Sequence, residues 1–250
     1  MGREGWRESA NESGAAMAGQ AATGPVNILV VSDEVDRLLY SDQIRERFAH
    51  VDLVLSCGDL PYSYLEFILS SLNVPLYGVR GNHDHGRGYD RPDSSCFAWE
   101  TADLHARTVR SHGLLLAGLE GSQRYNDGPR QYTEFDMRLQ VARLLPRLLW
   151  NRFRHGRYLD ILVTHAPPAY IHDKDDLPHQ GFQTFRWFLR AFRPRYHLHG
   201  HIHIYNYDKD AVTKTRFHDT LVLNAYGYRQ LQIDPVAPAA PAPSKGRAAA

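Results

Sequence analysis

Short apolar runs recur along this chain, and each of them predicts a buried strand. They are Val26–Val31, Val51–Ser56, Val74–Arg80, Leu159–Val163 and Tyr196–His199. Segments with helical spacing separate the first three runs and predict helices at Ser41–Phe48 and Tyr62–Leu72. Two strand–helix–strand crossovers in succession are typical of a parallel sheet.

The second half of the chain mixes strand and helix patterns. A hairpin is predicted at Arg107–Leu119, and helices are predicted at Glu134–Asn151 and Phe182–Phe192. The first of these helices has Leu139, Leu144, Leu145 and Leu148 at helical spacing, and Pro146 is expected to kink it. Further strands are predicted at His203–Asp208, Thr220–Asn224 and Gln230–Ile233. Two facing sheets with helices outside satisfy this pattern, so the predicted fold class is an α/β, two-sheet mixed β sandwich flanked by helices.

Length and composition fit one domain with irregular ends. We expect a tail at residues 1–25, a folded domain at 26–234 and a second tail, rich in Ala and Pro, at 235–250. The first segment has no continuous apolar stretch like that of a signal peptide, and no run is long enough to span a bilayer, so the expected location is the cytoplasm and no membrane partner is expected. A net charge of +1 argues against nucleic acid as a general partner. Two cysteines, Cys57 and Cys96, do not make a disulfide framework.

Polar residues of metal-binding types follow the predicted strands. They are Asp33, Asp59, Asn82 in Gly-Asn-His-Asp, His165, and the two histidines His201 and His203 of Gly-His-Ile-His. The carboxyl ends of parallel strands meet at one edge of a sheet, so these side chains are expected to converge. Oxygen and imidazole donors without a thiolate suit Mn, Fe or Zn at a hydrolytic centre better than a structural zinc site.

Each of these residues also has a simpler interpretation when taken alone. Asp33 and Asp59 each precede a possible helix and could be N-caps. Gly-Asn is itself a turn dipeptide, and Gly-His-Ile-His could be a histidine-rich loop. However, five successive strand ends all carry residues of ligand types, and this favours a metal site over the separate interpretations. On an extended chain His201 and His203 point the same way, because residues two apart share a face.

Two residues in Gly-Asn-His-Asp are candidates for catalysis. His83 is free to donate or accept a proton near the reaction. Asp84 could orient the His83 imidazole and raise its basicity, as carboxylates beside histidines do.

The order Asp … Gly-Asp … Gly-Asn-His-Asp … His … Gly-His-x-His resembles that of the calcineurin-like metallophosphoesterases, from Ser32 to His203. The resemblance implies a two-sheet sandwich, a site with two divalent metal ions, and hydrolysis of a phosphate mono- or diester by a metal-activated water. Carried over by position, Asp59 bridges both metals, and His83 gives a proton to the leaving oxygen. Asp33 and His203 bind the first metal, and Asn82, His165 and His201 bind the second.

One position departs from that family. Its first motif is Asp-x-His, whereas this chain has Asp33-Glu34-Val35, and valine cannot ligate. Glu34 and Asp36 lie near, but strand alternation favours neither of them as a replacement. The expected result is a weakened first metal position. If the loss of this histidine abolishes catalysis, the protein is a degenerate, non-catalytic member of the family that acts as a binding module. This is the alternative function.

The substrate is not fixed by these motifs. Arg80 and the loop from His172 to His179 lie near the expected site, and arginine suits phosphate because its fork matches the oxygens. Taken separately, each of these residues is more simply a solvated surface residue. The small domain and the neutral charge favour a small phosphoester as the partner over a nucleic acid. A nuclease would need a basic groove beside the metals.

Overall fold

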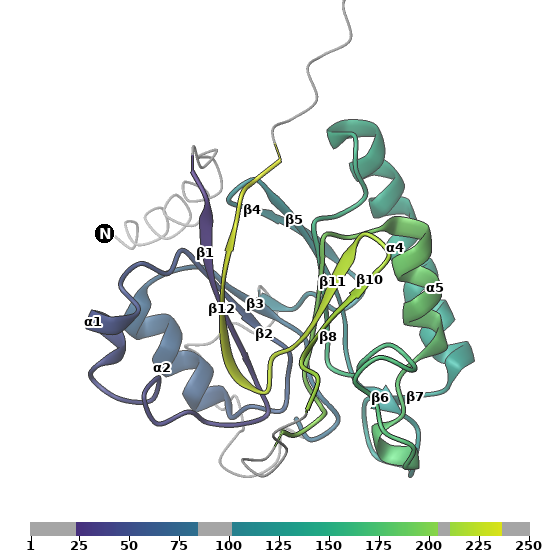
Figure 1. Ribbon diagram of the computed structural model, residues 1–250, viewed down its shortest axis with the longest axis horizontal. Helices are drawn as coiled ribbons and strands as arrows, with labels where there is room; N and C mark the ends of the chain where they lie inside the picture. The colour runs from purple at the N-terminus through teal and green to yellow at the C-terminus, as the bar shows by residue number, and fades with distance from the viewer. Residues whose placement is uncertain (1–23, 85–101, 205–210, 237–250) are drawn as a thin grey trace, which may run out of the picture.

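The computed structural model describes residues 24–84, 102–204 and 211–236, and it contains two large sheets (Figure 1). The four-stranded sheet has the order β12 (Gly227–Ile233), β1 (Val26–Ser32), β2 (Leu53–Ser56), β3 (Leu76–Gly78). The six-stranded sheet has the order β10 (Lys214–Phe217), β11 (Thr220–Asn224), β9 (Tyr196–His199), β8 (Ile161–Thr164), β5 (Leu114–Leu119), β4 (Thr108–Ser111). A short parallel pair, β6 (Ser122–Gln123) and β7 (Gln131–Tyr132), stands apart from both.

The parallel strands place their carboxyl ends along one edge. In the four-stranded sheet β1, β2 and β3 are parallel, with Val30 opposite Leu55 and Val54 opposite Leu76. In the six-stranded sheet β5, β8 and β9 are parallel. The predicted strand–helix–strand crossovers at the start of the chain are therefore confirmed.

Three apolar clusters hold the layers together. One lies between the two sheets and contains Val30, Leu55 and Leu198. The second packs the four-stranded sheet against α1 (Ile44–Arg47) and α2 (Tyr62–Leu72), and the third packs the six-stranded sheet against α4 (Glu134–His155) and α5 (Gln183–Phe192). Figure 1 shows the two helix pairs on opposite sides of the molecule. The predicted α/β sandwich of two mixed sheets flanked by helices is confirmed.

Several boundaries differ from the prediction for local reasons. Helix α1 is shorter than Ser41–Phe48, whereas α4 continues beyond Asn151 to His155. A capping box between Thr133 and Asp136 starts α4, and Gly156, with φ of 75°, ends it. Pro146 lies inside α4 on its exposed side and does not end it.

The structure also contains an edge strand that was not predicted and exposes one leucine of α4. Strand β10 was not predicted, because Lys214–Phe217 has alternating exposed positions at a sheet edge and no apolar run. Leu139 has helical spacing with Leu144 and Leu148, but it is exposed, whereas those two are buried.

Some predictions fall wholly or mostly outside the described residues. Of the predicted strand His203–Asp208, the first two residues are not strand and the rest lie outside the described part. Most of both predicted tails, and the loop after Asp84, also lie outside it. No helix in the described part of the chain is long and apolar enough to cross a membrane.

Candidate metal centre

Three of the six predicted ligands have a left-handed backbone. The φ angles are 64° at Asp33, 55° at Asp59 and 66° at His201. A non-glycine residue in this region costs about 1–3 kcal/mol, and such residues gather at functional sites. Each one directly follows a strand or its short extension, so the turn redirects the side chain from the sheet into the space where the strand ends meet.

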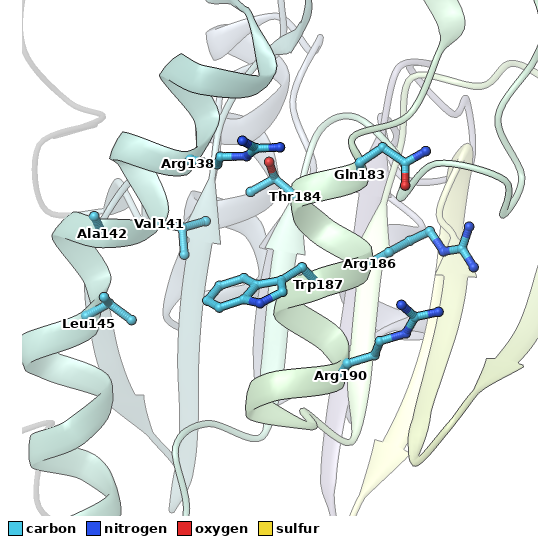
Figure 2. A pocket seen from close by; sticks show the side chains of 9 residues that line it. All are labelled: Arg138, Val141, Ala142, Leu145, Gln183, Thr184, Arg186, Trp187 and Arg190. Atoms are coloured by element: carbon cyan, nitrogen blue, oxygen red, sulfur yellow. The ribbon is translucent and has the colours of Figure 1, made fainter.

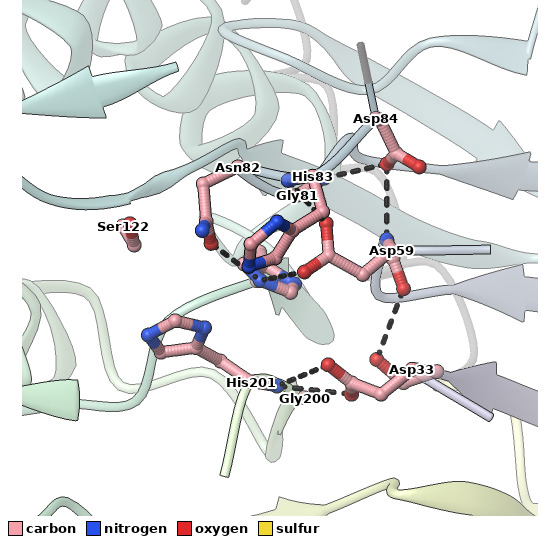
Figure 3. Close-up of polar contacts among 12 residues, drawn as sticks. Asp33, Asp59, Gly81, Asn82, His83, Asp84, Ser122, Gly200 and His201 are labelled. Atoms are coloured by element: carbon pink, nitrogen blue, oxygen red, sulfur yellow. Dashed lines mark hydrogen bonds and ion pairs between the residues drawn. The ribbon is translucent and has the colours of Figure 1, made fainter. Parts of the chain in front are cut away.

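Four predicted ligands form the centre of the site. One ligand atom from each of Asp59, His165 and His201 lies within 4.8 Å of the other two. His165 Nε2 is 3.2 Å from Asp59 Oδ2 and 3.1 Å from Asn82 Oδ1. His165, His201 and Asn82 are buried. Donors from four separate strand ends thus converge, as Figure 3 shows for the labelled residues.

In both His165 and His201, one ring nitrogen is hydrogen-bonded to a backbone carbonyl, which leaves the other nitrogen for a metal. His165 Nδ1 donates to the Cys57 oxygen at 2.8 Å, so Nε2, which faces the site, is the nitrogen that can bind a metal once its proton has left. His201 Nε2 lies 2.7 Å from the Pro178 oxygen, which leaves Nδ1 as the potential ligand atom. Carbonyl partners of this kind fix the tautomer of metal-binding histidines. Pro178 lies in the predicted His172–His179 loop, which therefore contacts the site.

The pKa values of the buried groups show that the Asp59 carboxylate needs a positive charge beside it. Burial would lower the pKa of His165, but the Asp59 carboxylate outweighs burial and raises that pKa to about 9. Burial favours neutral Asp59, yet the charge and hydrogen bond of His165 hold the pKa of Asp59 well below its usual range. Burial, helped by the charge of His165, lowers the pKa of His201 to about 3. A proton on His165 thus balances Asp59, and a divalent cation among these donors would replace it, so the donor set fits a metal.

Asp33 and His203 form the other part of the site. The side chain of Asp33 is fully buried, and both of its oxygens accept from the backbone N–H of His201 at 3.0 Å. His203 Nε2 lies 3.7 Å from Asp33 Oδ1. The expectation that an extended chain aligns His201 with His203 is wrong, because His201 is left-handed; both imidazoles nevertheless reach the site.

Asp36 does not take the place of the missing histidine, because its carboxylate is engaged elsewhere. Val35 packs against the apolar cluster under α1 and α2. Asp36 Oδ1 accepts the N–H groups of Leu38 at 2.8 Å and Leu39 at 3.3 Å, so it caps a turn. The expected first metal position is therefore left with Asp33, Asp59 and His203 as its candidate donors.

The N-cap interpretation of the two aspartates is wrong. Helix α1 begins after Gln43 and α2 begins after Pro61. The Asp33 carboxylate instead bonds to His201, and Asp59 Oδ1 accepts the backbone N–H of His83 at 2.8 Å.

His83 and Asp84 occupy different environments. His83 is exposed beside Asp59. Asp84 Oδ2 accepts the backbone N–H of Asp59 at 3.0 Å and that of Gly81 at 2.7 Å, and burial together with the Asp59 charge raises the pKa of Asp84 to about 6. Through these two hydrogen bonds Asp84 links the turn at Asp59 to the turn at Gly81. This role differs from the predicted one, which was to orient the His83 imidazole.

Two glycines are required by close packing at the site. A Cβ on Gly81 would lie 2.0 Å from Asp59 Oδ1 and 2.6 Å from His165 Cε1. A Cβ on Gly200 would lie 1.9 Å from Ser32 Oγ and 2.4 Å from Asp33 Oδ2. Both clashes are closer than real contacts allow, so the ligands occupy space that only glycine leaves open.

Sequence reasoning missed the segment between β5 and α4. The Tyr125 hydroxyl accepts from Asn82 Nδ2 at 3.1 Å, which turns Asn82 Oδ1 toward His165. Arg130 donates to the Asp84 carbonyl at 2.5 Å. Both residues lie in a polar loop with no strand-end pattern, so the sequence carried no signal for them. Arg80, a candidate for phosphate contact whose simpler interpretation was a solvated surface residue, pairs with Glu120 at 3.0 Å and Asp103 at 3.4 Å.

The two-sheet sandwich and the site at its strand ends define a protein of the metallophosphoesterase fold. A family model described as calcineurin-like phosphoesterase matches residues 26–205, and the chain belongs to that family. No curated protein sequence matches the chain.

Solved structures align with it at low identity. One aligns with a TM-score of 0.55 at 13% identity, over 83% of this chain and 95% of that chain. TT1561 of Thermus thermophilus has a TM-score of 0.51 at 14% identity, over 81% of this chain and 90% of its own. The calcineurin-like phosphoesterase YfkN from Bacillus subtilis has a TM-score of 0.37 at 10% identity, over 85% and 91% respectively. At such identities the first two alignments support the fold alone.

Proposed function

We propose that this protein is a metal-dependent phosphoric ester hydrolase with a dinuclear site of unequal metal positions. The observation that carries the proposal is the convergence of Asp59, His165 and His201, with donor atoms within 4.8 Å, beside the Asn82 oxygen. Membership of a phosphoesterase family supports it.

The donors divide into two sets that share Asp59. Asn82, His165 and His201 would hold one ion with Asp59, and Asp33 and His203 would hold the other. Divalent cations so placed would neutralise the phosphate and lower the pKa of a bound water. The ion is Mn, Fe or Zn on the chemistry of oxygen and imidazole donors.

The chain itself supplies proton transfer and alignment. His83 is exposed beside Asp59, which suits a group that gives a proton to the leaving oxygen of the substrate. Asp84 keeps the turns of Asp59 and Gly81 in register through its two backbone hydrogen bonds. Tyr125 holds the Asn82 amide with its oxygen toward the ligands.

The two positions are expected to differ in affinity. Asn82, His165, His201 and Asp59 offer four donors that are largely buried, whereas the first position has three and includes the half-exposed His203. We expect calorimetric titration of Mn²⁺ to give one tight and one weaker binding event. Val35, partly buried against the apolar cluster under α1 and α2, offers no ligand, and this favours a second candidate function, a binding module that keeps one metal without turnover.

The substrate class follows from the same site. Two arginines near the site in the described part of the chain, Arg80 and Arg130, both pair with Glu120, and the net charge of the chain is +1, so neither feature favours a nuclease. We propose a small phosphate mono- or diester.

The test is metal content by elemental analysis, with hydrolysis of an aryl phosphodiester and an aryl phosphomonoester with and without Mn²⁺. Asp59→Asn should lose both metals and activity. Asp52→Asn is the matched control, because Asp52 accepts the Asn27 N–H at 2.8 Å at the opposite edge of the same sheet and should keep both. Wild-type protein that binds one ion and hydrolyses neither ester at saturating Mn²⁺ would refute the hydrolase and favour the binding module.

A further inference from the structure

Helix α4 carries a second apolar face, directed away from the protein. Its inner face, with Met137, Val141, Leu144 and Leu148, is buried on the six-stranded sheet. On the outer face Phe135 is 66% exposed, Trp150 60% and Phe153 80%, and Leu139 and Leu149 are exposed as well. Single exposed apolar residues are ordinary, but a continuous apolar surface of this kind indicates an interaction site.

The outer residues follow a regular spacing. Phe135, Leu139, Ala142, Pro146, Leu149 and Phe153 alternate by four and three positions along the helix. This spacing forms a straight ridge on one side of a helix, about 27 Å long at 1.5 Å per residue. The ridge therefore spans most of α4.

Arginines flank the ridge on both sides. Those on α4 are Arg138, Arg143, Arg147, Arg152 and Arg154, and those on α5 are Arg186 and Arg190. The only acidic residues of these two helices, both fully described, are Glu134 and Asp136 in the first turn of α4. Both are engaged: Glu134 accepts from Thr184, and Asp136 caps α4 through Thr133. The face is therefore strongly basic in a chain of net charge +1.

A cavity of about 590 Å³ continues this surface between the two helices (Figure 2). Its apolar walls include Val141, Leu145 and Trp187, and three arginines line it as well. The Arg186 Nε is buried without a hydrogen-bond partner in the described structure, and the guanidinium lies 5.1 Å from the ring centre of Tyr170. Apolar walls with arginine side chains beside them suit a ligand that is part hydrocarbon and part anion.

Charge argues against a second copy of this chain on the ridge. Antiparallel pairing about the helix midpoint would match Phe135 with Phe153 and Leu139 with Leu149. The same pairing would place Arg143 near, though not directly opposite, its own counterpart, and Arg138 near Arg152 of the second copy. Like charges in such flanking positions destabilise a helix pair, so the partner is expected to be anionic.

The extent of this surface favours an anionic lipid bilayer over an acidic protein helix as the partner. A helix seated in the α4/α5 cavity would meet Arg138, Arg186 and Arg190, but it would leave Phe135, Trp150 and Phe153 in water. A bilayer surface covers the ridge and both arginine flanks together. Trp, Phe and Leu on one side with arginine beside them are the features of helices that lie in the membrane interface.

We propose that the outer face of α4 and α5 docks on an anionic phospholipid bilayer, with α4 parallel to the surface. The proposal goes beyond the hydrolase and is independent of it. It departs from the expectation of no membrane partner, which considered only segments that span a bilayer. Docking of this kind needs no spanning helix.

The experiment is co-sedimentation of the full chain with vesicles of phosphatidylcholine alone and of phosphatidylcholine mixed with phosphatidylglycerol. Binding is expected to the mixed vesicles only, and it should weaken with salt. Arg143→Ala with Arg147→Ala should lower binding roughly 25-fold, since each arginine near an anionic surface contributes about fivefold. Arg45→Ala with Arg47→Ala on α1, also exposed, is the matched control and should bind like wild type.

The apolar contribution has its own variant. Trp150→Ser with Phe153→Ser should abolish binding while the far-ultraviolet circular dichroism and the aryl ester hydrolysis stay as in wild type. Absence of binding to the mixed vesicles at low salt would overturn the proposal, and so would binding that survives both α4 variants. Capture of an acidic amphipathic peptide without vesicle binding, or a dimer in light scattering that Trp150→Ser with Phe153→Ser dissociates, would overturn it in favour of those occupants.

Discussion

Gly81→Ala adds one methyl group beside the candidate ligands and changes none of them, so it tests how tightly they are packed. The added methyl would lie 2.0 Å from Asp59 Oδ1 and 2.6 Å from His165 Cε1, where ordinary contacts begin at about 3.5 Å. More than an ångström of movement is needed. Asp59 cannot move alone, because its carboxylate is held by His83 N–H at 2.8 Å and its backbone by Asp84 at 3.0 Å.

The expected cost has two parts. Forcing a methyl into a packed site costs about 1–3 kcal/mol of folding free energy. Displacing a catalytic geometry by about 1 Å lowers the rate roughly 100-fold. We therefore expect Gly81→Ala to remain folded, to lose the ion shared by Asp59 and His165, and to lose most hydrolysis. Metal content, thermal unfolding and kcat/KM on the aryl phosphodiester measure the three effects.

Gly24→Ala is the matched control, because nothing lies within 4 Å of the added methyl, and it should behave as wild type. Gly200→Ala is the informative partner variant. Its methyl would press on Asp33 and Ser32 rather than on His165, so it should weaken the first metal position. A Gly81→Ala protein with full metal content and wild-type turnover would refute the reasoning, since the ligands would then not be held where the structure has them.

Three further predictions concern single groups. His83→Ala should abolish turnover with little loss of metal, as measured by kcat and elemental analysis; an unchanged rate would remove His83 from the mechanism. Tyr125→Phe removes a hydrogen bond to Asn82 worth about 1 kcal/mol, so Mn²⁺ binding should weaken about fivefold in calorimetry while the fold is kept, and unaltered affinity would make Tyr125 a bystander. Because His165 in the metal-free protein has a pKa of about 9 and must lose its proton to bind a metal, Mn²⁺ affinity should rise about tenfold per pH unit from 7 to 9 and then level off. A flat affinity profile over that range would contradict the Asp59–His165 pairing.

The sequence alone predicted most of the strands, the parallel order of the first three, and the polar residue types that follow them. These features depend on local patterns, because a buried strand must be apolar and the residue that follows it is free to be polar. The glycines beside Asp59, Asn82 and His201 were also readable, since only glycine leaves room at a crowded turn. The family order of residues added the expected pairing of ligands with two metals.

Only the tertiary structure decided how those residues are used. The left-handed turns at Asp33, Asp59 and His201, and the carbonyls that select one nitrogen of each imidazole, depend on contacts between strands far apart in the chain. Tyr125 became part of the site only because a loop with no pattern of its own folds over Asn82. Along α4 the sequence has two apolar stripes of similar spacing, and nothing local distinguishes them. The sheet buries Leu144 and Leu148 and leaves Leu139 in solvent, because one helix can turn only one face to the core.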